Sequence, residues 1–269
     1  MAAFKKMLII GCGNMGGAML AGWLAAGVPA SRFEVLDRNM DNPPAGVVVH
    51  RSLPDRAGYD SVMLGFKPQQ LTASAPDLQV VTQGKTVFSL LAGIEVSMLA
   101  EAFPDAAAHV RVMPNLASRI GKSPVILTGD GLDGADRAQA KALFDHLGTA
   151  VWLDDESKFD LVTALAGSGP GFVYRFIDAL SGAAQELGLD AEMADPLAFS
   201  MVEGASQLAA GSDVPPAQLA DRVASPGGMT REGLDVLDAD DALKNLLIAT
   251  LRATADRGGA LAQASRNHR

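Results

Sequence analysis

Disulfides, metal-ligand clusters and a basic surface are all missing from this sequence. Its 269 residues include one cysteine, Cys12, so an intramolecular disulfide is excluded and a reducing compartment, the cytoplasm, is expected. Four scattered histidines form no pattern with metal-ligand spacing, and we predict no metal site. A formal net charge of −9 argues against nucleic acid or an anionic membrane as a partner. The 48% hydrophobic content is ample for a core and for part of a subunit interface.

One long segment, residues 7–31, carries no charge and has the length of a membrane-spanning helix. Six glycines interrupt it, its first four residues are typical of a strand, and its flanks lack the charge bias of a membrane anchor. A secretory signal is disfavoured as well, because Gly11 breaks the apolar run soon after Lys5 and Lys6. We therefore predict a soluble protein with no membrane partner.

The apolar run at residues 7–10 leads directly into Gly11-x-Gly13-x-x-Gly16, and helix-like spacing follows to about Ala26. Strand, glycine turn and helix in this order are typical of dinucleotide-binding folds. We expect Gly11 to make the tight turn, Gly13 to let the backbone approach a pyrophosphate, and Gly16 to allow close helix packing. The unpaired N–H groups and the dipole of the helix would then attract the phosphates. An ordinary strand-to-helix turn is the alternative.

Two charged residues follow the second expected strand, residues 33–36. Asp37 lies 21 residues after Gly16, about where an acidic residue binds the adenosine ribose. Arg38 beside it would instead bind a 2′-phosphate. The choice between NADH and NADPH therefore stays open, and plain solvated charges at a strand end are a third interpretation. Cys12, inside the glycine turn, is interpreted as a small buried residue rather than a nucleophile.

Short apolar runs alternate with helix-like spacing over the first half of the chain. Strands are expected at residues 7–10, 33–36, 47–49, 61–64, 87–91, 110–113, 125–128 and 150–153, and helices at about 69–81 and 133–147. This alternation predicts an α/β fold with an N-terminal Rossmann-type, doubly wound and mainly parallel sheet. The turns at Lys67 and Ala92 would then lie at the carboxyl edge of the sheet, beside the glycine turn, where ligands bind.

From Asp154 onward helical periodicity replaces the strands, so we predict a dinucleotide-binding domain at residues 1–153 and an all-α domain at residues 154–269. Helices are expected near residues 156–166, 170–187, 191–210, 216–223, 229–237 and 242–264, with a kink or restart at Pro196 and a fraying tail from Arg257. The second and the sixth helix are apolar over most of their circumference and need cover on several sides. We infer an intertwined homodimer from this; a self-contained bundle is the alternative.

Two glycine-rich motifs interrupt the helical half, AGSGPGF at residues 166–172 and VASPGGMT at residues 223–230. Each opens a predicted helix, and Pro170 suits the first turn of the helix that follows it. Glycines and hydroxyl residues at a helix start leave N–H groups unpaired, which makes a pocket suited to a carboxylate. Taken alone, each motif is equally compatible with an ordinary capped loop. Beside a dinucleotide fold, the pair favours a substrate site.

Together these motifs resemble those of the pyrroline-5-carboxylate reductases over nearly the whole chain. The resemblance rests on GCGNMGGAM (residues 11–19), GFKP (65–68), LAGI (91–94), VMPN (112–115), GSGPGF (167–172) and SPGGMT (225–230), of which the last two are the most specific. It implies reduction of the small molecule 1-pyrroline-5-carboxylate to L-proline with NADPH or NADH, the final step of proline biosynthesis. It also implies a Rossmann domain followed by a helical dimerisation and substrate domain, in homodimers that in some members assemble into higher homo-oligomers.

The resemblance also assigns the site residues, motif by motif. The cofactor residues it implies are Gly11, Gly13, Asn14, Met15 and Gly16 at the pyrophosphate, Lys67 and Pro68 in the cofactor cleft, and Ala92 and Gly93 near the nicotinamide. The substrate residues it implies are Ser225, Gly228, Met229 and Thr230. Thr230 is the candidate catalytic residue, because the family threonine that it matches reaches the ring nitrogen. Met229, Gly171 and Arg222 depart from the family pattern, which leaves pocket shape and cofactor preference open.

The chemistry demands positioning rather than a strong acid, because a cyclic imine accepts hydride readily once its nitrogen is protonated or hydrogen-bonded. Neither motif of the helical half contains lysine or histidine. A β-hydroxyacid dehydrogenase shares the two-domain plan but needs a lysine on the long helix at residues 170–187, and that stretch has none. A cofactor-binding regulator without catalysis is the remaining alternative, and Ser225 and Thr230 weigh against it.

Overall fold

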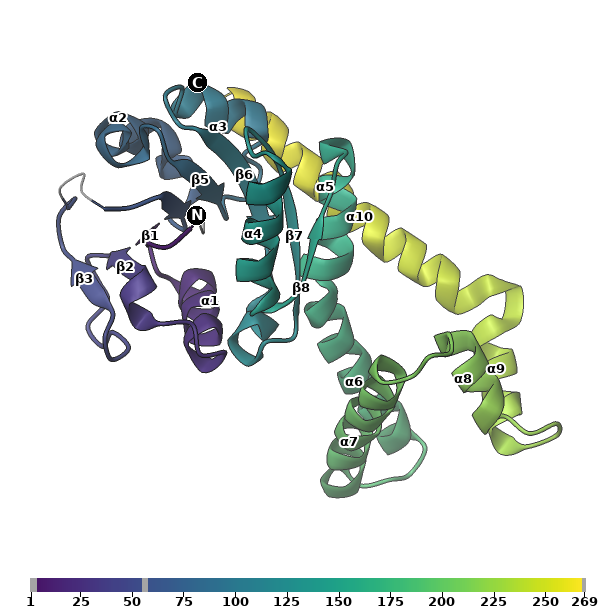
Figure 1. The fold of residues 1–269 in the computed structure, drawn as a ribbon. Coiled ribbons are helices and arrows are strands. Elements are labelled where there is room, and N and C mark those ends of the chain that lie inside the picture. The colour runs from purple at the N-terminus through teal and green to yellow at the C-terminus, as the bar shows by residue number, and fades with distance from the viewer. Residues whose placement is uncertain (1–3, 55–57, 268–269) are drawn as a thin grey trace. The chain divides into compact units, whose positions relative to one another are not determined.

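The computed structural model describes residues 4–54 and 58–267 and contains an eight-stranded sheet (Figure 1). Its strands are β1 (Met7–Ile10), β2 (Phe33–Leu36), β3 (Val48–His50), β4 (Ser61–Leu64), β5 (Thr86–Ser89), β6 (Ala108–Met113), β7 (Ser123–Asp130) and β8 (Gly148–Trp152). They lie side by side in the order β3-β2-β1-β4-β5-β6-β7-β8. Every predicted strand is confirmed, with ends displaced by at most two residues.

The sheet is parallel except between β6 and β7, which run antiparallel. Ile10 pairs with Leu36 on one side and with Leu64 on the other, and Leu64 pairs with Ser89. The carboxyl ends of these four strands therefore lie level at one edge of the sheet. The chain order reverses between β1 and β4, and the crevice at such a reversal is where open α/β sheets bind ligands.

Helices cover both faces of the sheet, because side chains along each strand alternate between the two faces. On one face α1 (Asn14–Ala25) and α4 (Gly134–Asp145) contribute to a core around Trp23, whose ring stacks on Phe33 at 4.9 Å. On the other face lie α2 (Leu71–Thr82) and α3 (Val96–Ala102). Periodicity did not predict α3, since seven residues are too few to show a helical repeat.

The described chain after β8 contains helices and loops, and short helical turns also lie between the strands. The helices are α5 (Phe159–Val162), α6 (Gly169–Glu186), α7 (Ala191–Ala210), α8 (Pro216–Val223), α9 (Met229–Asp238) and α10 (Ala242–Asn267), with short helical turns at η1 (Ala30–Arg32), η2 (Pro68–Gln70), η3 (Leu116–Ile120), η4 (Glu156–Lys158) and η6 (Ala239–Asp241) and a π-helix, η5 (Thr163–Gly167). The single helix expected at residues 156–166 is thus three short pieces. Helix α7 continues through Pro196 and does not restart there.

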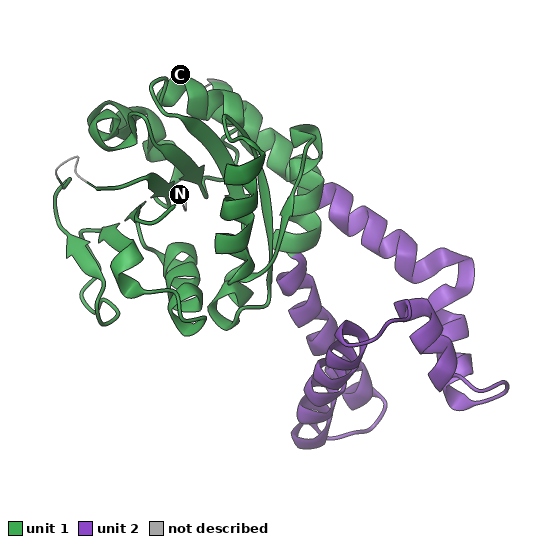
Figure 2. Cartoon of the chain, viewed as in Figure 1, with its two compact units in different colours: residues 1–168, 254–269 green, residues 169–253 purple. Residues whose placement is uncertain are grey.

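The chain forms two compact units, drawn in different colours in Figure 2. Unit 1 comprises residues 1–168 and 254–269, and unit 2 comprises residues 169–253. This division does not coincide with the boundary expected after Leu153, because residues 154–168 and the end of α10 belong with the sheet. Phe159 shows why: it is buried, and the guanidinium of Arg111 on β6 lies 3.8 Å from the centre of its ring.

The tail expected to fray from Arg257 is instead helical to Asn267, the last described residue. Two contacts explain the order. Ala262 is buried, and a Cβ atom on Gly258 would lie only 3.0 Å from the carboxylate of Asp160, so glycine lets the helix approach α5 closely.

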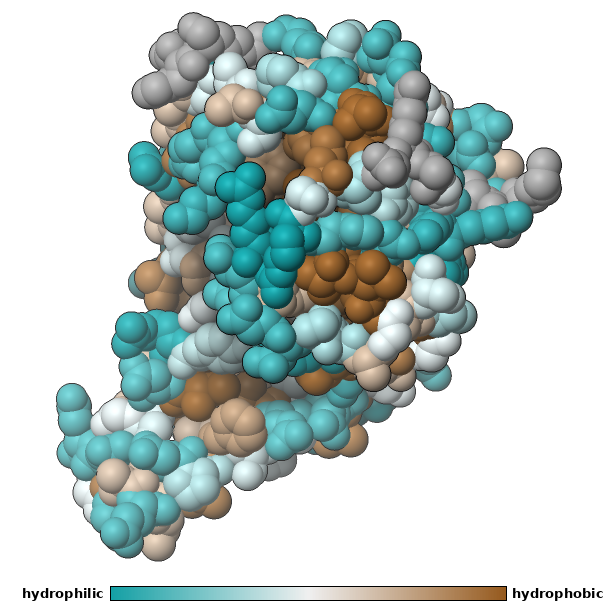
Figure 3. Space-filling model, turned by 90° about the vertical axis from the view of Figure 1, so that its left-hand side faces the viewer, coloured by the Kyte–Doolittle hydropathy of each residue, from teal (hydrophilic) through white to brown (hydrophobic). Residues whose placement is uncertain are grey.

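Unit 2 exposes large apolar side chains on its helices. Val173 and Phe176 on α6 are 46% and 50% exposed, and Leu246 on α10 is 65% exposed. Hydrophobic patches also reach the surface on the face of the molecule shown in Figure 3. No helix within residues 4–54 and 58–267 is long and apolar enough to cross a membrane.

Candidate active site

The first candidate site is the glycine turn between β1 and α1. Gly11 has a φ of +81°, and a Cβ atom there would lie 2.8 Å from the backbone nitrogen of Phe66. Its neighbour across the turn is equally restricted, because a Cβ atom on Gly65 would lie 2.4 Å from the carbonyl oxygen of Gly11. Two loops of the sheet edge therefore approach each other through bare backbone, which only glycine allows.

The start of α1 is open and offers unpaired donors. Gly13 precedes the helix without a side-chain cap, and a Cβ atom on it would meet none of the described residues within 4 Å. In the part of the chain that the structure describes, the N–H groups of Asn14, Met15 and Gly16 have no hydrogen-bond acceptor. Gly16 is the close-packed member of the motif, since its Cβ would lie 3.2 Å from the Gly11 carbonyl oxygen. This geometry fits a pyrophosphate bound at a helix start.

Asp37, at the end of β2, faces the glycine turn. Its Oδ2 accepts a hydrogen bond from the N–H of Cys12 over 2.8 Å, and its Oδ1 accepts one from the N–H of Asn39 over 2.8 Å. Arg38 is exposed. Sequence reasoning missed Arg51, which donates to the carbonyl oxygens of Asp37 and Met40 over 2.9 and 2.8 Å and so fixes the loop after β2.

The Cys12 thiol is not a nucleophile at neutral pH. Burial, with a smaller contribution from the charge of Asp37, raises its pKa to about 11. Only the protonated thiol is then present at pH 7, and thiols react as thiolates. The expectation that Cys12 is a small buried residue rather than a nucleophile agrees with the raised pKa, but the residue is only partly buried.

The turns after β4 and β5 complete this edge of the sheet. After β4, Lys67 is exposed, and its N–H donates to Oε1 of Gln70 over 3.3 Å. After β5, Ala92 is exposed whereas Gly93 is buried and has a φ of +71°. The structure thus brings every predicted cofactor residue to one edge of one unit: Gly11, Gly13, Asn14, Met15, Gly16, Asp37, Arg38, Lys67, Pro68, Ala92 and Gly93.

The second candidate site is the loop that opens α9 in unit 2. Gly227 has a φ of +69°, and the N–H of Gly228 donates to the carbonyl oxygen of Ser225 over 2.9 Å. A Cβ atom on Gly228 would lie 2.4 Å from Ser225 Oγ, so the hydroxyl lies directly against the backbone of the helix start. Helix α9 begins at Met229 without a side-chain cap, and within the described residues the N–H groups of Met229 and Thr230 have no acceptor.

Charged neighbours of this loop are already engaged with each other. Arg231 donates to Oδ1 of Asp221 over 2.8 Å, and this hydrogen bond raises the pKa of the guanidinium. Asp235 lies 3.9 Å from the same side chain. Ser225, Met229 and Thr230 are exposed, which leaves the hydroxyls and N–H groups of the loop accessible to a ligand.

The structure gives Asn115 of the VMPN motif a role that sequence reasoning did not assign. Its Nδ2 donates to the carbonyl oxygen of Ala166 over 2.9 Å, and its N–H donates to Ser123 Oγ over 2.9 Å. Ala166 lies in the π-helix η5, just before the GSGPGF motif. A π-turn leaves carbonyl groups that an α-helix would pair, and such turns are frequent at functional sites. Asn115 therefore ties the end of β6 to this turn.

Comparisons with known proteins identify the family of the chain. Residues 156–261 match the family model described as pyrroline-5-carboxylate reductase dimerisation, and residues 6–93 match the one described as NADP oxidoreductase, coenzyme F420-dependent. Pyrroline-5-carboxylate reductase 2 of Bacillus subtilis is 32% identical over 94% of each chain. The pyrroline-5-carboxylate reductase of Pseudomonas aeruginosa is 33% identical over 96% of this chain and 97% of its own. The chain belongs to the pyrroline-5-carboxylate reductase family.

A solved structure of this family has the same fold. The pyrroline-5-carboxylate reductase of Coxiella burnetii superposes with a TM-score of 0.87 at 29% identity, covering 96% of this chain and 98% of its own. Family membership makes the protein an NADP-dependent oxidoreductase with an N-terminal Rossmann-like domain and a C-terminal helical domain. The predicted fold class and cofactor class are thereby confirmed.

Proposed function

We propose that this protein reduces 1-pyrroline-5-carboxylate to L-proline, with the cofactor held at the glycine turn of unit 1 and the substrate held at the start of α9. The substrate assignment rests on the geometry at the start of α9. Glycine residues, a hydroxyl held against the backbone and two unpaired N–H groups form a small, exposed anion site. A substrate carboxylate matches it in charge and in hydrogen-bond geometry.

The residues of unit 1 fit a dinucleotide. Unpaired N–H groups at Asn14, Met15 and Gly16 would hold the pyrophosphate, and the empty space around Gly13 leaves room for it. Asp37 and Arg38 would contact the adenosine ribose, Lys67 and Pro68 would line the cleft, and Ala92 would face the nicotinamide. When bound, NADPH or NADH supplies the hydride for the imine carbon.

Thr230 is the residue that we place at the ring nitrogen. The imine must be protonated or hydrogen-bonded at nitrogen to accept hydride, and the Thr230 hydroxyl would donate or orient that hydrogen bond. The carboxylate would be anchored by the N–H groups of Met229 and Thr230, with Ser225 Oγ and Gly228 beside them. Because the loop Ser225–Thr230 contains no strong acid, fixing the substrate geometry would contribute most of the rate.

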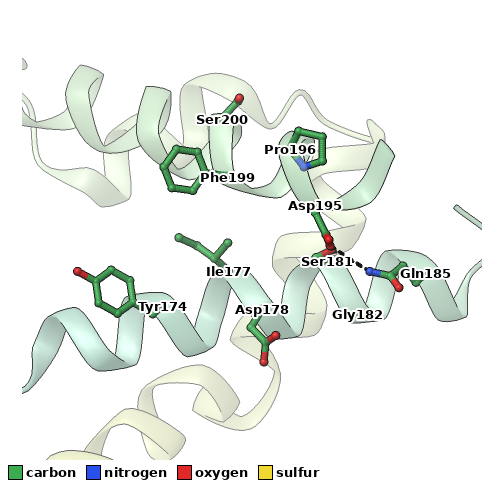
Figure 4. A pocket seen from close by; sticks show the side chains of 10 residues that line it. All are labelled: Tyr174, Ile177, Asp178, Ser181, Gly182, Gln185, Asp195, Pro196, Phe199 and Ser200. Carbon is green, nitrogen blue, oxygen red and sulfur yellow. Dashed lines mark hydrogen bonds between the residues drawn. The ribbon is translucent and has the colours of Figure 1, made fainter. Parts of the chain in front are cut away.

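We propose a homodimer built through unit 2. The family model that matches residues 156–261 is one of dimerisation, and the helices of this unit expose apolar side chains. Figure 4 shows the hollow between α6 and α7, about 730 Å³ in volume, into which Ile177 and Phe199 project. Beside it, Ser181 on α6 donates to Asp195 on α7, which fixes the pair of helices as a unit. A partner helix would cover these side chains.

Oxidation of NADPH and of NADH, followed separately with racemic 1-pyrroline-5-carboxylate, tests the reaction. We expect turnover that depends on the imine, with L-proline as the product. We also propose a cytoplasmic location, with which the single free cysteine, Cys12, is compatible. Oxidation of a β-hydroxy acid by the protein, without reduction of the imine, would contradict the proposal.

A further inference from the structure

The end of α10 lies directly behind the turn that follows β5. Gly93 is buried because Leu261 and Ala262 pack against it: a Cβ atom there would lie 3.1 Å from the carbonyl carbon of Leu261 and 3.2 Å from the nitrogen of Ala262. Ala92, the preceding residue, is exposed. In this turn Ala92 is therefore exposed to solvent, whereas Gly93 packs against the backbone of a helix that comes about 170 residues later in the chain.

An ion pair joins the same two segments at the residue that follows the turn. Arg266 Nη1 lies 2.5 Å from Oε1 of Glu95, a contact that spans 171 positions of the sequence. Glu95 is the residue immediately before α3, and its carbonyl oxygen accepts the first hydrogen bonds of that helix, from the N–H groups of Met98 and Leu99. Arg266 therefore acts on the junction between the turn and α3.

Both segments are anchored to the sheet independently. The N–H of Val96 donates to Oε1 of Glu156 over 3.0 Å, and the same oxygen accepts from Arg111 over 2.7 Å. The close approach of Gly258 to Asp160 fixes α10 about one helical turn before the Gly93 contact. Because Val96 and Gly258 are fixed by these contacts, the Arg266–Glu95 pair and the Leu261–Gly93 contact limit the movement of the turn at residues 92–94.

We infer that residues 258–266 of α10, here named the brace segment, hold the turn at residues 92–94 in the shape that presents Ala92 to the nicotinamide. Arg266 would be a positioning residue, because it would act through Glu95 and we assign it no contact with substrate or cofactor. The inference rests on the proposed function, which places the nicotinamide at Ala92. None of the six motifs that carry the family resemblance includes the brace segment or Glu95.

The brace segment should affect cofactor use more than substrate use. A turn that moves more freely would present Ala92 less often in the productive position, so the KM for NADPH would rise while the KM for 1-pyrroline-5-carboxylate would stay the same. The Arg266 pair is partly exposed, 47% on the arginine and 31% on the glutamate, so its loss would change the unfolding temperature little.

The test compares four full-length proteins: wild type, Arg266→Gln, Arg266→Lys and the control Lys141→Gln. Lys141 forms a comparable surface pair with Asp145 at 2.7 Å on α4. Hydrogen exchange of the peptide containing residues 91–97 is measured without ligand, and steady-state kinetics are measured with each substrate varied. For Arg266→Gln we expect faster exchange in that peptide and a roughly three- to fivefold higher KM for NADPH. Arg266→Lys should restore both, and Lys141→Gln should match wild type.

Exchange at residues 91–97 that stays at the wild-type rate in Arg266→Gln would overturn the inference, whatever the kinetics show. Faster exchange with an unchanged KM for NADPH would also overturn it. In that case the Arg266 pair would order the turn, but the order of the turn would not affect cofactor binding. If wild type fails to reduce 1-pyrroline-5-carboxylate, the proposed function fails, and the KM for NADPH is replaced by its Kd from fluorescence titration. The exchange experiment then still decides whether the brace segment holds the turn.

Discussion

The N–H of Cys12 donates a hydrogen bond to Oδ2 of Asp37 over 2.8 Å, which ties the end of β2 to the glycine turn after β1. The register of the sheet makes this contact possible, because Ile10 and Leu36 are paired and the next residues of each strand leave the sheet together. A carboxylate is thereby held beside the helix start that offers unpaired N–H groups. The contact joins the two parts of the expected cofactor site, the part for the pyrophosphate and the part for the ribose.

Replacing Asp37 by asparagine should shift cofactor preference toward NADPH. The change keeps an acceptor for the Cys12 N–H but removes a negative charge that would repel a 2′-phosphate. We expect the ratio of kcat/KM for NADPH to that for NADH to rise by about tenfold, or roughly 1.4 kcal/mol. Arg38→Gln should move the same ratio in the opposite direction. A ratio unaffected by Asp37→Asn would show that this carboxylate does not face the ribose.

Gly13→Ala separates cofactor binding from folding. A methyl group at this position meets no atom of residues 4–54 and 58–267 within 4 Å, so the free energy of unfolding should change by less than about 0.5 kcal/mol. It would occupy the space expected for the pyrophosphate, and the KM for NADPH should rise by about tenfold or more. Gly65→Ala is the matched contrast, since its Cβ would lie 2.4 Å from the Gly11 carbonyl oxygen and should destabilise the fold itself. Equal KM values for wild type and Gly13→Ala would contradict the assignment.

Thr230→Ala should lower kcat/KM with 1-pyrroline-5-carboxylate while leaving the fold intact, because Thr230 is exposed. If its hydroxyl makes a charge-assisted hydrogen bond to the ring nitrogen, the loss is roughly 2 to 3 kcal/mol of transition-state stabilisation. Thr230→Ser keeps the hydroxyl and should retain most of the activity. Steady-state kinetics of the two variants decide the matter: equal activity of Thr230→Ala and wild type would eliminate this role.

Acid should destabilise unit 1 through Glu34. Burial by itself would raise the pKa of this carboxyl, but hydrogen bonds from Lys6, Tyr59 and His50 outweigh it and lower the pKa to about 2, from an ordinary value of 4.5. Because the pKa is lower in the folded state, the stabilisation is complete above pH 4.5 and is lost as the pH falls toward 2. Its size is on the order of 2 to 3 kcal/mol.

Urea unfolding of wild type and Glu34→Gln at pH 7 and at pH 2.5 measures this contribution. The difference in unfolding free energy between the two proteins should be largest at pH 7 and should shrink at the lower pH. Asp77→Asn, a change at an exposed carboxylate on α2, should show little difference from wild type at either pH. A gap between Glu34→Gln and wild type that does not depend on pH would mean that the Glu34 charge contributes nothing.

The strands and most helices could be predicted because their signals are local. An apolar run of four residues ended by glycine, as at residues 7–11, needs no distant partner to be recognised. The error at the C-terminal end of the chain came from distant contacts. The end of α10 was expected to fray because it is rich in glycine, arginine and asparagine. Instead, Gly258 lets the helix approach Asp160, and Arg266 pairs with Glu95, 171 positions earlier in the sequence. Composition alone does not contain that information.

The same distinction between local signals and distant contacts applies to the candidate site. The glycine turn and the loop at Ser225–Thr230 are visible as motifs, since glycine at these positions is required by positive φ or by close backbone approach. Arg51 and Asn115 were not assigned roles, because each acts on the carbonyl oxygen of a segment that the sequence does not show to be near. The roles of the individual site residues stay predictions until they are tested.

A crystal structure with NADP+ and a proline analogue that cannot be oxidised tests the central claim most directly. We predict the carboxylate of the analogue at the N–H groups of Met229 and Thr230, the Thr230 hydroxyl at the ring heteroatom, and the nicotinamide beside Ala92 with its C4 roughly 3.5 Å from the reacting carbon. An analogue bound away from the loop Ser225–Thr230, or a nicotinamide turned away from it, would contradict the account.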